Sequence, residues 1–146
     1  MAWADAKARI VEVLETLEIT EPEAQTIKRV YPNPPGTIGD VPCVIVYPPA
    51  LTVVRQSSSL RKKVYTIRML LLVKDADLSQ AAALVDAYRE AMIDLFDTDL
   101  TLNYTASIID GPNIDAAADF IVGDRHYTGM DCILGITLME AANYQP

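Results

Sequence analysis

Two long stretches of alternating residues constrain the fold of this chain more than any other feature. The apolar members of residues 60–74 that share one face of an extended backbone are Tyr65, Ile67, Met69, Leu71 and Val73. In residues 126–140 the residues that share one face are Thr128, Met130, Cys132, Leu134, Ile136 and Leu138. Each stretch predicts a strand far longer than the usual ~5–6 residues, so the far end of the strand 60–74 is expected to project beyond the core.

The opposite face of the second stretch carries two glycines, Gly129 and Gly135, beside Asp131 and Thr137. Glycine inside a strand has no side chain to pack, and it often marks a bend or a close approach of another backbone. We therefore expect a bend or a close contact at these two positions.

Two segments have the periodicity of amphipathic helices. In residues 4–19 the apolar face is formed by Ala6, Ile10, Val13, Leu14 and Leu17. In residues 79–96 it is formed by Leu84, Val85, Tyr88, Met92, Leu95 and Phe96. Pro22 ends the first helix, since proline cannot continue a helix interior, and Asp77 or Ser79 can cap the second.

Shorter apolar runs bounded by turn residues predict further strands at residues 26–31, 43–49, 51–55, 103–109 and around 120–122. Residues 56–59 and 110–113 are expected to be turns. Between the first two strands lies a loop, residues 32–42, which is expected to be irregular and extended because it is rich in proline and glycine.

The order of these elements and their short connections favour antiparallel pairing. We predict an α+β fold, with a mainly antiparallel, mixed sheet, two helices packed on one face, and a long protruding β-hairpin made by residues 51–74. The length of 146 residues fits one domain, so residues 1–146 are interpreted as a single domain.

The charge of the chain is unevenly distributed. The formal net charge is −8, yet residues 55–74 hold six of the 12 basic residues and no acid. These six residues are Arg55, Arg61, Lys62, Lys63, Arg68 and Lys74. Strong net acidity argues against a general nucleic-acid binder, which must neutralise phosphates. A basic hairpin on an acidic body can instead contact the acidic surface of another copy, and such a head-to-tail contact closes into a ring if the rotation allows.

The residues do not assemble a recognisable catalytic pattern. His126 is the one histidine, and the two cysteines, Cys43 and Cys132, lie in apolar runs typical of buried, reduced thiols. No glycine-rich phosphate loop is present. We expect no cofactor. The start of the chain lacks the pattern of a signal peptide, and no apolar run approaches the roughly 20 residues of a membrane span, so a soluble protein made in a cytosol is expected.

The element order resembles the tail-terminator and head-to-tail joining proteins of long-tailed bacteriophages. The resemblance covers most of the chain: the helix "ARIVEVLETL", the loop-rich strand pair "YPNPPGTIGDVPCVIVYPP", the hairpin "LTVVRQSSSLRKKVYTIRMLLLV", the second helix "DADLSQAAALVDAYREAMIDLF" and the strand ending "CILGITLMEA". The resemblance consists of the order of the elements, their lengths and the general character of their sequences.

The resemblance implies a structural virion protein, not an enzyme, that forms a hexameric ring at the tail–neck junction. Such a ring ends growth of the tail tube, joins the tail to the head, and lets the genomic DNA pass through its lumen. Its partners are other copies of itself, the tail tube protein and the head-completion or neck protein. The expected location is the virion, and the host cytoplasm during assembly.

Two sets of residues become candidates for these contacts. The candidates for an inter-subunit or lumen contact are Arg55, Arg61, Lys62, Lys63 and Arg68. The candidates for a loop that clasps a neighbour are Pro32, Asn33, Pro34, Pro35 and Gly36.

Three alternatives stay open from the sequence. The first is another neck or head-completion adaptor of the same class. The second is a small cytosolic ligand-binding protein or enzyme with an aspartate-lined site. The aspartates concerned are Asp94, Asp97, Asp99, Asp110, Asp115 and Asp119, although turns and helix ends also favour this residue. The third is a nucleic-acid-binding accessory protein that uses the basic hairpin.

Overall fold

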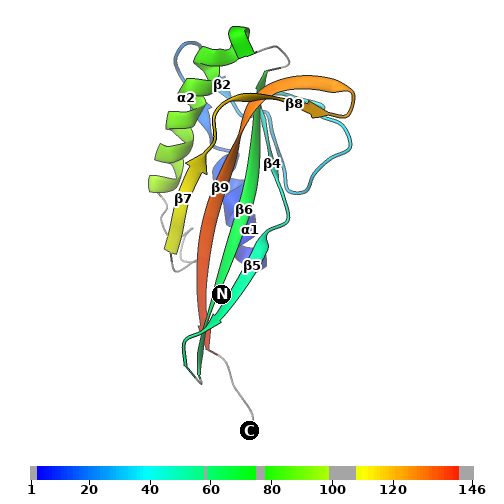
Figure 1. Cartoon of the computed structure of the whole chain (residues 1–146). Helices are drawn as coiled ribbons and strands as arrows, with labels where there is room; N and C mark the ends of the chain where they lie inside the picture. Colours follow the sequence, from blue (N-terminus) through cyan, green and yellow to red (C-terminus); the bar gives the residue numbers. More distant parts are fainter. Residues whose placement is uncertain (1–2, 58, 75–77, 99–107, 142–146) are drawn as a thin grey trace.

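The computed structural model of the chain describes residues 3–57, 59–74, 78–98 and 108–141. Figure 1 shows a mixed α+β arrangement with two helices, as predicted. In chain order the elements are α1 (Trp3–Leu14), β1 (Glu18–Ile19), β2 (Gln25–Thr26), β3 (Arg29–Tyr31), β4 (Cys43–Val46), β5 (Ala50–Arg55), β6 (Leu60–Lys74), α2 (Leu78–Asp97), β7 (Ile108–Ile114), β8 (Ala118–Val122) and β9 (Arg125–Ala141).

Seven of the strands form one sheet, which is mostly antiparallel, as predicted. Its central order is β3-β4-β6-β9-β7, while β5 also pairs with β6, and β8 also pairs with β9. Strands β3 and β4 are parallel, and the other neighbours in this sheet are antiparallel. The short strands β1 and β2 form a separate antiparallel pair.

The two long strands, β6 and β9, are the centre of the sheet. β6 has the predicted bounds, and β9 extends the predicted strand by one residue at each end. β6 pairs with β9 from one end to the other, from Leu60 opposite Ala141 to Lys74 opposite Thr128. The predicted burial of one face is confirmed, because every residue predicted for it is buried. These residues are Tyr65, Ile67, Met69, Leu71 and Val73 in β6, and Thr128, Met130, Cys132, Leu134, Ile136 and Leu138 in β9.

A single hydrophobic cluster combines this face of the sheet with apolar residues of α1 and α2. Ile10 and Leu14 of α1, and Tyr88 and Met92 of α2, are fully buried in it. The helices therefore form here because each has one apolar stripe to bury, as their periodicity predicted.

A smaller cluster lies on the other face of the sheet. Leu70 and Leu72 of β6 pack there with Tyr31, Ile38 and Tyr127. The loop 32–42 contributes Ile38, and the Tyr31 hydroxyl accepts a hydrogen bond from the Gly39 N–H at 3.0 Å. Both faces of this part of β6 are thus buried, which explains the continuous apolar run in its sequence.

Gly129 of β9 is the site of the close backbone contact expected from the sequence. A Cβ atom at this position would lie 2.1 Å from the carbonyl oxygen of Leu71 in β6. The pairing of the two strands is irregular just beyond this point, between Leu72 and Lys74. Only glycine fits where the two backbones approach so closely.

The prediction of one helix over residues 4–19 is wrong at its end. Helix α1 stops at Leu14, and Thr16 and Leu17 then make backbone bonds to the residues three positions earlier, at 3.0 and 3.1 Å. Such bonds tighten the last turn of a helix. Glu18 and Ile19 pair instead with β2, because β1 can bury the β-branched Ile19 in the core.

Other strand boundaries also differ from the sequence prediction. Residues 26–31 divide into β2 and β3, and the strand expected at residues 43–49 ends at Val46. The expected strand 103–109 lies largely outside the described residues, as does Asp77, one of the two proposed caps. Residues 110–113, expected to be a turn, lie inside β7, where Gly111 has a positive φ of 92° and the register shifts as in a β-bulge.

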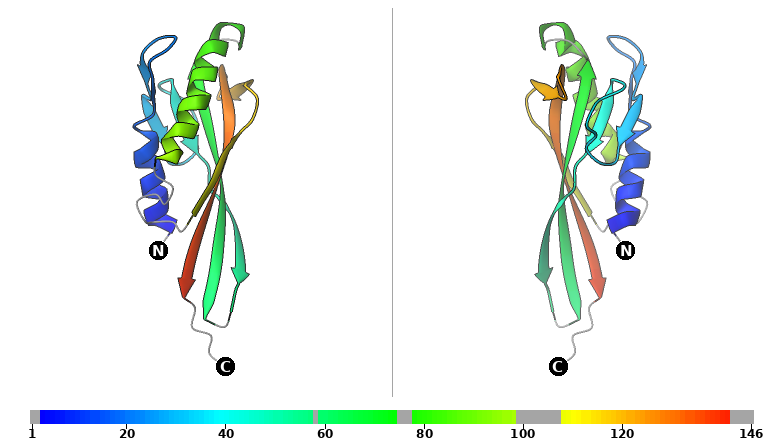
Figure 2. Two further views of the ribbon diagram at one scale, coloured as in Figure 1. Left: turned by 90° about the vertical axis from the view of Figure 1, so that its left-hand side faces the viewer. Right: turned by 90° about the vertical axis from the view of Figure 1, so that its right-hand side faces the viewer.

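One end of the sheet consists of β5, residues 60–66 of β6 and residues 135–141 of β9; we call it the arm. β9 pairs with β6 as far as Leu60, so the arm has three strands where the sequence predicted a two-stranded hairpin. Figure 2 shows that the strands at this end extend beyond both helices.

Candidate assembly surface

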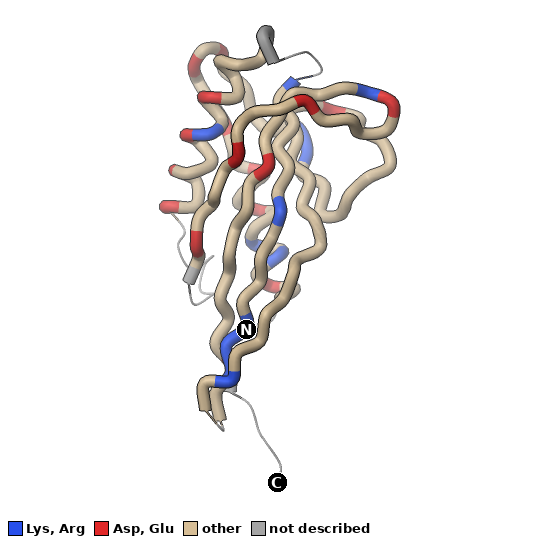
Figure 3. Tube along the Cα trace, in the orientation of Figure 1, with Lys and Arg blue, Asp and Glu red and all other residues tan. Residues whose placement is uncertain are grey.

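The arm gathers four of the five basic candidates. Arg55, Arg61, Lys62 and Lys63 lie in paired rows near its tip, whereas Arg68 lies further along β6. Because side chains alternate along a strand, Arg61 and Lys63 share the face of Tyr65, and Lys62 and Arg68 lie on the opposite face. In Figure 3 basic residues mark the tip of the arm, whereas the side of the molecule formed by β7 and α2 is more acidic.

Glu140 of β9 compensates two of these charges within the chain. Its carboxylate contacts the guanidinium of Arg61, which lies directly opposite, and the Lys63 ammonium lies 3.0 Å from the same oxygen. Hydrogen bonds from Lys63 and Arg61 lower the pKa of Glu140 from its usual value of 4.5. The cluster fixes the tip of β6 to the end of β9.

Asp131 compensates a third charge on the other face. Arg68 donates two hydrogen bonds to its carboxylate, at 2.6 and 3.2 Å, and the guanidinium carbon lies 4.4 Å from the centre of the Tyr47 ring. The bond to Asp131 raises the pKa of Arg68 above its usual range, so the residue stays charged. Arg68 therefore has a clear role within the chain, as a link between β6, β9 and the residue that follows β4.

Lys62 differs from its neighbours. Within the residues that the structure describes, its ammonium makes no ion pair, and Val54 and Met139 flank it on the adjacent strands. Three of the basic residues in 55–74, namely Arg61, Lys63 and Arg68, are thus paired within the chain, so fewer charges are available to a partner than the sequence indicated. Among Arg61, Lys62 and Lys63, it is Lys62 whose charge is left for an outside contact.

The arm also exposes apolar surface that the sequence reasoning missed. All six residues of β5 are exposed, and the large apolar side chains concerned are Leu51, Val53 and Val54, with Leu60 at the start of β6. Their exposed fractions lie between 37% and 48%. At the base of the arm, the ring of Trp3 stacks on Tyr65 with centroids 4.7 Å apart, so α1 covers only this end of the surface.

Acid should weaken the Glu140 cluster. Because the folded state lowers the pKa of Glu140, its ionised form stabilises the fold at neutral pH, and this contribution is lost as the pH falls below 4.5. We expect Glu140→Gln to lower the melting temperature at pH 7 and to differ less from the wild type near pH 3. Thermal melts followed by circular dichroism at both pH values measure this.

Glu90→Gln, on the exposed side of α2, removes one negative charge without touching the arm and is the control. A melting-temperature difference for Glu140→Gln that is equally large at both pH values would show that its carboxylate does not act through ionisation.

The clasp candidates lie at the edge of the loop 32–42. Pro32, Asn33, Pro34 and Gly36 are exposed, while Pro35 is half-buried. The loop also contacts its own chain, since Lys7 of α1 donates a hydrogen bond to the Asn33 side chain at 3.3 Å. These residues are available to a partner, and their place in a clasp stays a prediction.

The aspartates of the alternative site are dispersed. Asp94 and Asp97 lie exposed near the end of α2. Asp110 is exposed in β7, Asp115 directly after β7 and Asp119 in β8, and Asp99 is outside the described residues. Among the residues that the structure describes, no group of three or more acidic, histidine or cysteine side chains could hold a metal ion. His126 is exposed in β9, opposite Ile121.

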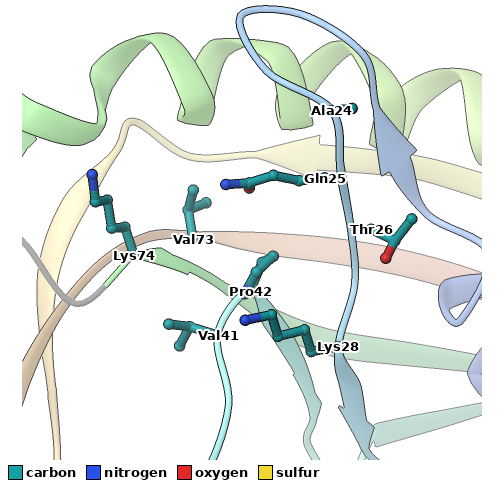
Figure 4. A pocket seen from close by; sticks show the side chains of 8 residues that line it. All are labelled: Ala24, Gln25, Thr26, Lys28, Val41, Pro42, Val73 and Lys74. Atoms are coloured by element: carbon teal, nitrogen blue, oxygen red, sulfur yellow. The ribbon is translucent and has the colours of Figure 1, made fainter.

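A pocket of about 410 Å³ lies between the β2 segment and the end of β6 (Figure 4). Its lining consists of Ala24, Gln25, Thr26, Lys28, Val41, Pro42, Val73 and Lys74. Two of these side chains are basic and none is acidic, so the pocket is not the aspartate-lined site that the sequence left open.

Both cysteines are buried and reduced, as expected. Burial raises the pKa of the Cys43 and Cys132 thiols to about 12. Because the thiolate is the reactive form, neither residue is suited to nucleophilic chemistry near neutral pH.

Neither helix, over the part of the chain that is described, is long and apolar enough to cross a membrane. No protein-family model matches the chain, and no curated protein is significantly similar to it.

Proposed function

We propose that this protein is a structural virion protein of a long-tailed bacteriophage. In this proposal six copies form a ring at the tail–neck junction, which ends growth of the tail tube and joins the tail to the head. The two helices form one layer on one face of the sheet, and β5 and β6 form a protruding hairpin that contacts the neighbouring copy. The tail tube protein and a head-completion protein are the other partners, and genomic DNA passes through the lumen.

The observation that carries the proposal is the arm. It combines exposed apolar side chains with a basic residue, Lys62, whose charge has no partner within the described chain. Exposed apolar surface of this kind marks interaction sites more often than it marks a solvated surface. The acidic body, with a net charge of −8 for the whole chain, supplies a complementary surface on each further copy.

A structural role is also in keeping with the chemistry of the described residues. The thiols are buried with a raised pKa, the acidic side chains are dispersed, and the pocket beside β2 is lined by no acid. Another neck or head-completion adaptor would share the ring and differ in its partners. The order of binding to tail tubes and to filled heads distinguishes these two possibilities.

The first test is assembly of the purified protein, followed by negative-stain electron microscopy and light scattering over a range of concentrations. We expect closed rings with a central hole wide enough for duplex DNA. Lys62→Glu should shift the population from rings to monomers, because it reverses the charge whose partner lies on the next copy. Higher salt should act in the same direction, since exposed charges are screened.

The choice of residue matters for this test. Changing Arg61 and Lys63 would also break the contacts with Glu140, so a failure to assemble would not report on the interface alone. Lys28→Glu makes the same charge change at an exposed position near the pocket, away from the arm, and is the matched control. Monomers at every concentration, alone and with tail tubes, would contradict the proposal.

A further inference from the structure

Strand β5 leaves one of its edges without a partner strand. In the described part of the chain it pairs with β6 alone, from Ala50 opposite Thr66 to Arg55 opposite Arg61. All six of its residues are exposed, and it holds three of the five large apolar side chains that are exposed in that part. An edge with these properties is a template for pairing with another strand.

The usual protections of an edge strand are missing from β5. Its sequence, "ALTVVR", has no proline, and its one charge is at the last residue. Val53 lies on one face and Val54 on the other, so the strand is apolar on both sides. Proteins that leave an edge open normally place charges, prolines or bulges there. The open edge of β5 therefore has the features of an edge that pairs with another strand.

The hydrogen-bond pattern shows which backbone groups are available. Gln56 donates its N–H to the carbonyl of Leu60 at 3.0 Å. Bonded and non-bonded pairs alternate along an antiparallel ladder, so the backbone groups of Leu51 and Val53 point away from β6. These outward N–H and C=O groups have the spacing that an added strand needs.

The opposite edge of the same sheet offers a matching strand. β7 pairs with β9 only, over the described residues, and it runs antiparallel to β9 as β5 runs antiparallel to β6. Because β6 and β9 are also antiparallel, β5 and β7 run in opposite directions. Two copies standing side by side in the same orientation would thus bring β5 of one copy antiparallel to β7 of the next.

The two edges also lie partly at the same level along the strands, and their charges are complementary. Ala50, Thr66, Gly135 and Asp110 lie in one row across the sheet, so the beginning of β5 is level with β7. The side of β7 carries exposed acids, Asp110 among them, while the arm carries the basic tip (Figure 3). The charges favour contact between unlike edges over contact between two β5 edges.

We propose that β5 of one copy pairs antiparallel with β7 of a second copy, so that the sheet continues from subunit to subunit. The inference rests on the proposed function, because it names the contact that would hold the ring together. Leu51, which lies in the same row across the sheet as Ile109 of β7, is then covered on assembly, and Lys62 approaches the acidic side of the neighbour. A contact between unlike edges propagates in one direction and can close into a ring.

Cross-linking of single-cysteine variants tests this pairing directly. Thr52 and Asp110 are exposed and lie on the same face of the sheet, so Thr52→Cys and Asp110→Cys place one thiol on each proposed edge. The natural cysteines are buried and do not compete. After mixing the two variants and adding a short bis-maleimide, we expect covalent dimers whose peptides join positions 52 and 110. Thr52→Cys mixed with Glu23→Cys, at the exposed β1–β2 connection, is the control and should give several-fold less dimer.

A proline variant tests the backbone itself. Leu51→Pro removes an outward N–H in the row of Ile109 and leaves the bonds to β6 in place, and edge strands tolerate proline in that orientation. We expect it to reduce the 52–110 cross-link to the level of the control, while Leu51→Thr, which keeps the N–H, cross-links like the parent. Circular dichroism confirms that both variants are folded.

The outcomes separate this inference from the proposed function. Rings in the electron microscope with cross-linking at the control level would overturn the edge pairing and leave the ring intact. Cross-links without closed rings would support the pairing and contradict the closed ring. The absence of both would overturn both.

Discussion

Gly129→Ala is expected to lower the free energy of unfolding by roughly 3 kcal/mol, the upper end of what overpacking a core usually costs. The added Cβ would lie 2.1 Å from the carbonyl oxygen of Leu71 and 3.1 Å from the Cα of Leu72. Both atoms belong to the backbone of β6, which cannot move away without disturbing its pairing with β4 and β9. Urea unfolding followed by circular dichroism gives the free energy.

Gly36→Ala is the matched control for this substitution. No atom lies within 4 Å of a Cβ at Gly36, so the same chemical change should alter the free energy of unfolding by less than about 0.5 kcal/mol. Equal effects at the two positions would mean that the strands do not approach closely at Gly129.

The parts of the fold that the sequence predicted best are those with a strong local period. The bounds of β6 follow from its alternation, and α2 differs from its predicted range by one residue at each end. Each of these elements buries a face whose spacing is visible in a single segment. Where the pattern is short, tertiary contacts decide which secondary structure a residue adopts. Ile19, for example, lies in β1 and not in the predicted helix.

The Gly111–Pro112 pair in β7 shows a second limit. Gly111 and Pro112 are typical turn residues, so the sequence predicts a turn at residues 110–113. The structure accommodates them as an irregularity in the pairing with β9, between Asp110 and Asn113. A partner strand that supplies hydrogen bonds on both sides of the irregularity keeps the segment extended.

For the candidate surface, the sequence located the basic residues but missed what surrounds them. Arg61 and Glu140 are 79 residues apart, and Arg68 and Asp131 are 63 apart, so their pairing depends on the register of β6 against β9. No local signal fixes that register. The exposed edge of β5 could have been suspected, because "ALTVVR" is apolar on both of its faces and contains neither proline nor an interior charge.

The register of the two long strands can itself be tested in the core. Leu134 of β9 is fully buried and lies directly opposite Ile67 of β6. Leu134→Ala should lower the free energy of unfolding by about 3–4 kcal/mol, because it removes buried methyl groups and leaves a cavity among well-packed neighbours. Urea unfolding at equilibrium measures this loss.

Ile133, the preceding residue, provides the comparison within the same strand. It is half-buried and lies opposite Arg68, on the face of the sheet away from the helices. Ile133→Ala removes a similar amount of hydrocarbon from a wetter site and should cost about 1 kcal/mol. A slip of β9 by one residue would exchange the two faces and reverse the order of the two costs. Because β5 and β7 are placed by their pairing with β6 and β9, the reversed order would also remove the basis for joining their edges between copies.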